Sequence, residues 1–168
     1  MEILIVRHGH AVDEAPGLGD AARWLTGKGR KATRKVGKWL TDEPERIPTE
    51  IWTSPLVRAV QTAEILAERL ALTDNVLVAG ELSPAREPGE LLKRFGAHSG
   101  AGQIAVIGHE PGLSRVAMAL LGDIPWPGFK KSGVLGVSWK GRGLATFRFL
   151  LNPKDFELIT DVTALRKA

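Results

Sequence analysis

The sequence contains no cysteine among its 168 residues. The chain can therefore form neither a disulfide framework nor a thiolate metal site, which fits a reducing compartment. No apolar run reaches the roughly 18 to 20 residues that a membrane span requires. The segment before Arg7 also lacks the charged region and the extended apolar region of a secretory signal. We therefore expect a cytoplasmic protein with no membrane partner.

The remaining composition is that of an ordinary globular protein, with 43% apolar and 25% charged residues. A chain of this length can bury one hydrophobic core but is short for two independent ones. No internal repeat and no long low-complexity linker divides the sequence. We expect residues 1–168 to form a single domain.

The charge is basic, with a formal net charge of +4 and a sequence pI of about 9.6. Such a balance favours encounters with anionic partners. The basic residues concentrate in one segment that also has apolar residues at the spacing of an amphipathic helix: Lys28, Arg30, Lys31, Arg34, Lys35 and Lys38. We interpret these charges mainly as a solvated helix face, with a docking patch for an acidic protein or nucleic acid as the alternative. Because no aromatic residue lies between positions 28 and 38, nucleic acid is the less expected partner.

Two short apolar runs, residues 3–6 and 103–107, are each followed by glycine and histidine. Such runs are typical of buried parallel strands that lead into a loop. Residues 51–53 and 76–78 predict two further strands, and helical patterns separate the strands from one another. The order of elements is therefore strand, then helix, repeated.

The clearest helix follows Thr53. Ser54 can cap it, Pro55 suits the first helical position, and apolar residues recur along one face: Leu56, Val60, Ala63, Ala67 and Leu70. A second helix is expected to open at Pro111 and to extend through Leu121.

The last third of the chain is rich in strand-forming residues. Residues 133–139 and 144–151 predict two strands joined by the basic turn 140–143, while residues 11–20 and 122–128 predict loops. The predicted fold is an α/β domain: a three-layer α/β/α sandwich with a mostly parallel central sheet and an antiparallel C-terminal hairpin. In such a sheet the ligand site lies beyond the carboxyl ends of the parallel strands.

Basic and imidazole side chains gather at that predicted edge. Arg7 and His8 end the first strand, His109 ends a later one, and Arg58 lies in the first turn of the helix after Thr53. Guanidinium groups fit phosphate oxygens and stabilise the charge that develops during phosphoryl transfer. A neutral imidazole can attack phosphorus and leave again. The set predicts phosphoryl transfer through His8 with no metal and no cofactor.

Other histidines and an unusual tryptophan allow alternatives. His8 and His10 form a His-x-His pair that could bind zinc with His109, although two nearby arginines would repel a divalent cation. We interpret His10 as a residue of the site's rim and His98 as solvent exposed. Trp126, between two prolines in a loop, could approach the rim and help select substrate, but packing is the simpler interpretation for the tryptophans.

Four ordered motifs resemble the histidine phosphatase superfamily, and their variants look like its SixA branch. They are residues 7–11 (RHGHA), 25–29 (LTGKG), 54–66 (SPLVRAVQTAEIL) and 108–114 (GHEPGLS). The resemblance implies that His8 is the catalytic nucleophile and that Arg7, Arg58 and His109 bind the phosphoryl oxygens. Gly9 and Glu110, in the same motifs, are expected at the substrate site. Members of the SixA branch remove phosphate from phosphohistidine on signalling proteins.

Larger relatives in that superfamily carry a carboxylate general acid, often on an insertion that this chain has no room for. Glu81 is the best candidate for such an acid and Glu87 the next, although either can be an ordinary loop carboxylate. Without an acid, substrates with good leaving groups are favoured. We therefore expect a phosphorylated protein with phosphohistidine as substrate, with a sugar phosphate or a nucleotide as the alternative.

Overall fold

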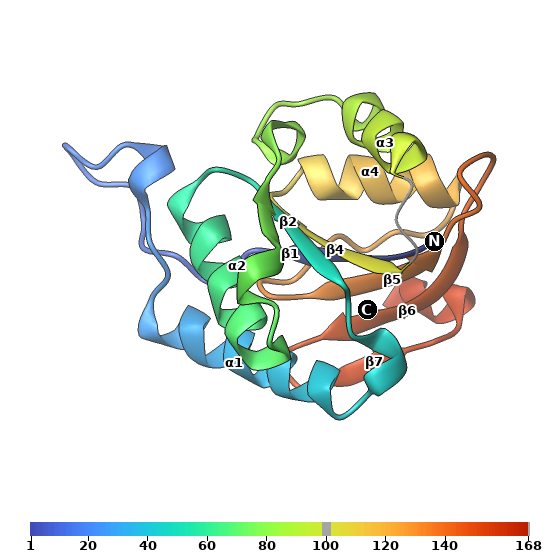
Figure 1. Ribbon diagram of the computed structural model, residues 1–168, viewed down its shortest axis with the longest axis horizontal. Coiled ribbons are helices and arrows are strands. Elements are labelled where there is room, and N and C mark those ends of the chain that lie inside the picture. Colours follow the sequence, from blue (N-terminus) through green and yellow to red (C-terminus); the bar gives the residue numbers. More distant parts are fainter. Residues whose placement is uncertain (99–101, 168) are drawn as a thin grey trace.

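The protein is described by a computed structural model covering residues 1–98 and 102–167, and its centre is a seven-stranded sheet (Figure 1). The strand order is β3-β2-β4-β1-β5-β6-β7. The strands are β1 (Glu2–Arg7), β2 (Glu50–Thr53), β3 (Val76–Val78), β4 (Gln103–Gly108), β5 (Val134–Ser138), β6 (Thr146–Asn152) and β7 (Glu157–Ile159). Strands β1 to β4 are parallel to one another, and β5 to β7 add antiparallel pairs. The predicted sheet and hairpin are confirmed, and β7 is an additional edge strand.

Helices cover both faces of the sheet. Helices α1 (Gly27–Thr41) and α2 (Val57–Leu70) lie on one face, and α3 (Pro88–Ala97) and α4 (Gly112–Leu121) on the other (Figure 1). Short 3-10 helices occupy Asp20–Ala22, Pro44–Arg46, Thr73–Asn75, Gly80–Leu82 and Val162–Lys167. The predicted three-layer sandwich is therefore confirmed. None of the described helices is long and apolar enough to cross a membrane.

Side chains of strand β1 join the hydrophobic cores on both faces of the sheet. Its side chains alternate, so that Ile3 and Ile5 join the core beneath α3 and α4, whereas Leu4 and Val6 join the core beneath α1 and α2. All four are almost fully buried. A continuous apolar run in a central parallel strand is the expected result of burial on both faces.

The basic segment forms α1, as its spacing predicts. The side chain of Thr26 caps the helix by accepting a hydrogen bond from the backbone N–H of Gly29 at 3.1 Å. A side chain at Gly29 would collide with the backbone of His10, so this glycine lets α1 pack closely against the segment that follows β1. Helix α1 thereby lies beside the carboxyl end of β1.

Helix α2 begins later than its sequence predicts. The helix starts at Val57 with Leu56 at the N-cap, so the expectation that Ser54 caps it and Pro55 opens it is wrong. The hydroxyl of Ser54 instead lies 2.8 Å from Nε2 of His109, a partner from another strand. The later start also leaves Leu56 only half-buried, while Ala63 belongs to the core.

Candidate active site

The site forms where β1 and β4 end side by side. Arg7 pairs with Gly108 in the sheet, and the backbone N–H of His8 donates to the carbonyl of Gly108 at 3.1 Å. This register places His8 next to His109, with ring centroids 4.9 Å apart and planes tilted by 51°. Both side chains are buried, each with 4% exposure. Two histidines far apart in the sequence thus lie side by side at this edge of the sheet.

Arg58 joins them from the second position of α2. Its Nε–H donates to Nε2 of His8 at 3.3 Å, and the residue is 5% exposed. Its two terminal nitrogens donate to the carbonyl and to the carboxylate of Asp20, at 2.6 and 3.0 Å. A guanidinium has five N–H groups, so two remain for another ligand.

His8 is held in one tautomer. Its Nδ1 lies 2.7 Å from the carbonyl oxygen of Gly9, which can only accept, so Nδ1 carries the proton and Nε2 presents its lone pair. Burial lowers the pKa of His8 to about 2, helped by the positive charge of Lys131, by His109 and by Arg58. The ring is therefore neutral across the physiological range. A neutral Nε2 is the form that can attack phosphorus.

His109 is also neutral, and one of its nitrogens is unused. Burial lowers its pKa to about 4, with Arg58 as the next cause. Its Nε2 lies 2.8 Å from the hydroxyl of Ser54. Its Nδ1 is buried without a hydrogen-bond partner among residues 1–98 and 102–167. A buried polar atom without a partner is costly, which favours a ligand at this position.

Arg7 shows a similar unused donor. One terminal nitrogen donates to the carbonyl of Phe129 at 2.6 Å, whereas Nε is buried and has no partner within the described part of the chain. Burial lowers the pKa of Arg7, and Glu110 opposes this effect. The guanidinium is thus anchored through one terminal nitrogen, while its Nε–H has no partner among the described residues.

Glu110 positions the loop that anchors Arg7, and its expected contact with substrate stays a prediction. Its carboxylate accepts hydrogen bonds from the backbone and hydroxyl of Ser114, at 3.1 and 2.7 Å, and from the backbone of Phe129 at 2.8 Å. These bonds point its charge into the protein. Trp126 belongs to the same network, because its Nε1–H donates to the hydroxyl of Ser114 at 2.9 Å and its ring packs edge-on against Phe129.

Gly9 allows the two helices α1 and α2 to pack closely behind His8. Its backbone N–H donates to the hydroxyl of Thr62 in α2 at 3.1 Å, and a Cβ at this position would lie 2.9 Å from the hydroxyl of Thr33 in α1. The absence of a side chain therefore lets β1, α1 and α2 meet directly behind His8. The expected contact of Gly9 with substrate stays a prediction.

Two charged residues of the site were not predicted from the sequence. Asp20, in the segment expected only to be a loop, bonds both Arg58 and Arg23. Burial raises the pKa of its carboxyl group, but hydrogen bonds from the two arginines outweigh this and lower it. Lys131 is half-buried, and burial together with Arg7, Arg23 and Arg58 lowers its pKa to about 8. No local motif marks either residue, because both are defined by contacts distant in sequence.

The remaining histidines do not join the site. His10 is exposed, and its Nδ1 lies 3.0 Å from the hydroxyl of Thr26. Across the ranges that the structure describes, no three His, Asp or Glu side chains gather so as to hold a metal ion, so the geometry does not support the zinc alternative. The prediction that His98 is solvent exposed is wrong. Its Nε2 lies 3.0 Å from the carboxylate of Glu50 and its ring packs edge-on against Trp52, because α3 ends over β2.

The two candidate acids border the site on the side of His109. Glu81 and Glu87 line a small cavity with His109, whose empty volume is about 280 Å³. The carboxylate of Glu81 is bound to Arg94 at 3.0 Å, and that of Glu87 lies 3.8 Å from Arg115. Both carboxylates are therefore engaged by arginines.

A cluster of two arginines and two neutral imidazoles, at the carboxyl end of a parallel sheet, is typical of an enzyme that transfers phosphoryl groups. The comparisons with known proteins agree. The chain belongs to the histidine phosphatase superfamily, whose branch 1 model matches residues 3–79.

Two known proteins and one solved structure are similar to this chain over most of its length. Phosphohistidine phosphatase SixA of Escherichia coli (strain K12) is 29% identical over 161 residues, which cover 94% of this chain and 98% of that protein. An uncharacterized protein of Picosynechococcus sp. is 36% identical over 142 residues, which cover 82% of this chain and 84% of that protein. The solved structure of the protein histidine phosphatase SixA complexed with tungstate superimposes with a TM-score of 0.85, at 29% identity, and covers 94% of this chain and 100% of that one.

Proposed function

We propose that this phosphatase removes phosphate from phosphohistidine on a protein and that the phosphoryl group passes through Nε2 of His8. The observation that carries this proposal is the neutral Nε2 of His8 beside Arg58, with Arg7 and His109 at the same edge of the sheet. The remaining N–H groups of the two guanidinium groups are donors for the oxygens of a phosphoryl group. The similarity to SixA complexed with tungstate, a tetrahedral oxyanion like phosphate, supports an oxyanion site here.

The reaction follows in two displacements. The lone pair of His8 Nε2 forms a bond to phosphorus while the bond between phosphorus and the leaving group breaks, and the leaving group keeps that electron pair and takes a proton. Water then attacks the phosphorus and loses a proton, and the bond to Nε2 breaks to release inorganic phosphate. Arg7 and Arg58 stabilise the charge on the oxygens in both steps, which is the task that a metal performs in other phosphatases.

Phosphohistidine is favoured as substrate because the carboxylates near His8 and His109 are bound by arginines, which does not favour a carboxylic acid as proton donor. The pKa of Asp20 is lowered, and Glu81 is bound to Arg94. An imidazole leaves from phosphorus more readily than an alkoxide does, because an alkoxide needs a proton as it departs. The name of the Escherichia coli relative, phosphohistidine phosphatase, agrees with this substrate class.

A second candidate, a phosphatase of sugar phosphates or nucleotides, rests on one observation. Glu81 borders the same cavity as His109, so a rearrangement that releases it from Arg94 would supply an acid for an alkoxide leaving group. If this function is the correct one, Glu81→Gln abolishes turnover of every substrate. If the phosphohistidine function is correct, Glu81→Gln slows only the alkyl esters.

The test is a substrate panel with a variant of the nucleophile. Wild type should hydrolyse a phosphohistidine peptide at least about 100-fold faster, in kcat/KM, than glucose 6-phosphate or a nucleotide. His8→Ala should lose this activity and retain a native circular dichroism spectrum, whereas His98→Gln, distant from the pocket, should retain both. Activity of His8→Ala near the wild-type value would refute the mechanism, and preference for a sugar phosphate would refute the substrate assignment.

A further inference from the structure

An open groove rich in lysine lies beside the active site. It is formed where α1, the loop before β5 and the turn between β6 and β7 meet, and its empty volume is about 930 Å³. We call it the lysine groove, after its six lysines: Lys28, Lys31, Lys35, Lys130, Lys131 and Lys154. No acidic residue lines it within the described part of the chain.

The positive charges of the lysine groove are not neutralised. None of its six lysines has a carboxylate within 4.0 Å among residues 1–98 and 102–167. Some basic residues elsewhere are paired, such as Lys38 with Asp42 at 2.8 Å and Arg46 with Glu43 at 3.0 Å. The formal charge of the whole chain, +4, is smaller than the six charges of the groove, so the rest of the molecule is slightly acidic. The excess positive charge is therefore concentrated in one place.

Lys131 connects the lysine groove with the catalytic pocket. It lines the groove, and its charge also acts on both His8 and His109. His10, which follows the nucleophile by two residues, lines the groove as well. A ligand in the lysine groove would therefore lie next to a phosphoryl group on His8.

We propose that the lysine groove binds an acidic surface of the phosphorylated protein substrate and thereby presents the phosphohistidine of that protein to His8. This inference rests on the proposed function. The groove supplies affinity and selectivity, while the pocket supplies the chemistry.

The dimensions of the groove fit several carboxylates better than one phosphate. Lys28, Lys31 and Lys35 follow one another along α1 over seven residues, which is roughly 10 Å of helix at 1.5 Å per residue. All three are exposed, so they act as mobile charges that attract a partner over a distance. Such exposed charges raise the association rate and make it sensitive to salt. This is the behaviour of an enzyme that meets and releases a protein substrate repeatedly.

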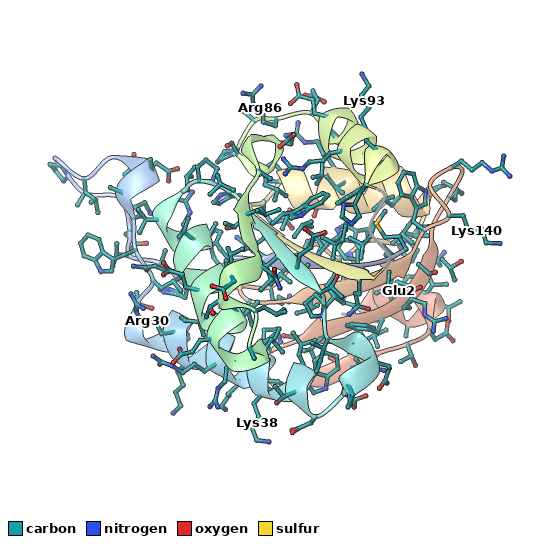
Figure 2. All side chains as sticks on the ribbon, viewed as in Figure 1. Glu2, Arg30, Lys38, Arg86, Lys93 and Lys140 are labelled. Atoms are coloured by element: carbon teal, nitrogen blue, oxygen red, sulfur yellow. The ribbon has the colours of Figure 1, made fainter. Side chains whose placement is uncertain are left out.

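The test uses two synthetic peptides, each with one phosphohistidine. One has glutamates and the other has glutamines in the flanking positions. The groove variant is Lys31→Gln/Lys35→Gln. The matched control is Lys93→Gln/Lys140→Gln, which removes the same charge at positions that project away from α1, as Figure 2 shows. The kcat/KM of each protein is measured for both peptides at low and at physiological salt.

We expect wild type and the control to prefer the acidic peptide by about tenfold at low salt, since each of two or three exposed charge pairs contributes roughly twofold. The groove variant should lose most of this preference, and salt should reduce it in wild type. An equal rate for both peptides in wild type, or an unchanged preference in the groove variant, overturns the proposal.

A binding measurement separates this proposal from the proposed function. The fluorescence anisotropy of a labelled glutamate-rich peptide without phosphohistidine reports docking even if neither phosphopeptide is hydrolysed. Binding that weakens in the groove variant alone supports the docking surface, whatever the reaction. If this peptide does not bind and a single-stranded oligonucleotide binds through Lys31 and Lys35, the partner is a nucleic acid and the proposal is wrong.

Discussion

Lowering the pH is the most informative perturbation of the active site, because the proposed mechanism requires a neutral His8. Burial and neighbouring positive charge lower the pKa of His8 to about 2, against 6.5 for an unperturbed histidine. At pH 5 an unperturbed imidazole is only about 3% neutral, whereas His8 should be about 99.9% neutral. The expected difference in available nucleophile at pH 5 is therefore roughly 30-fold.

The assay is nuclear magnetic resonance of protein labelled with ¹⁵N in the histidine rings, titrated from pH 8 to pH 4.5. The spectrum of His8→Gln assigns the signals of the nucleophile. Nε2 of His8 should keep the chemical shift of an unprotonated nitrogen throughout, and Nδ1 that of a protonated one, because Nδ1–H donates to the carbonyl of Gly9. A His8 signal that titrates with a midpoint near 6.5 would refute the reasoning.

The lowered pKa values of the two buried histidines also predict how stability depends on pH. Both His8 and His109 have lower pKa values in the folded state than in the unfolded state, so below pH 6.5 the unfolded chain binds protons that the folded protein does not. Each histidine then reduces the free energy of unfolding by about 1.4 kcal/mol per pH unit as pH falls. This loss begins near pH 6.5 and continues to about pH 4 for His109 and about pH 2 for His8. The free energy of unfolding is measured by urea denaturation between pH 6.5 and 4.5. In His8→Ala it should fall less steeply with decreasing pH than in wild type, by about that amount per pH unit. The same dependence on pH in both proteins would contradict the burial of a neutral His8.

Three further changes address the charges around the phosphoryl group. Arg58→Ala should lower kcat/KM by at least about 100-fold. Arg58→Lys should recover only part of this loss, because a point charge lacks the forked donors of guanidinium. Full recovery of kcat/KM in steady-state kinetics would argue against this geometry. Excess chelator should leave the phosphatase activity unchanged, because the arginines supply the charge that a metal would supply. Activity that is lost in chelator and restored by zinc would favour a metal site. Asp20→Asn should lower the inhibition constant of tungstate by about tenfold, because the carboxylate bound to Arg58 repels an incoming dianion. A higher inhibition constant would indicate that Asp20 instead holds Arg58 in the position that binds the anion.

The layers of the fold and the edge that carries the site could be predicted from the sequence because the signals are local. The apolar run of β1 and that of β4 end at histidines, and parallel strands bring such ends to the same edge. The spacing of apolar residues in α1 likewise predicts its buried face, since Val36 and Leu40 are buried and Lys31 and Lys35 are exposed.

The details that the sequence did not predict depend on partners distant in the chain. Ser54 is a good helix cap by local rules, yet its hydroxyl lies next to His109, 55 residues later. Asp20 lies in a segment expected only to be a loop, yet its carboxylate accepts a hydrogen bond from Arg58, 38 residues later. In each case a tertiary contact outweighs a local preference, and such contacts are defined only once the layers have packed.

The central claim is a phosphoryl group bound covalently to His8. The most direct measurement is rapid quenching of the reaction of a ³²P-labelled phosphohistidine peptide in alkali, followed by mass spectrometry of the protein. The account predicts a label that is stable in alkali and labile in acid, that lies on Nε2 of His8, and that forms and decays as fast as turnover. Turnover at the full rate with no label on His8, or a label on another residue that decays at the rate of turnover, would contradict it.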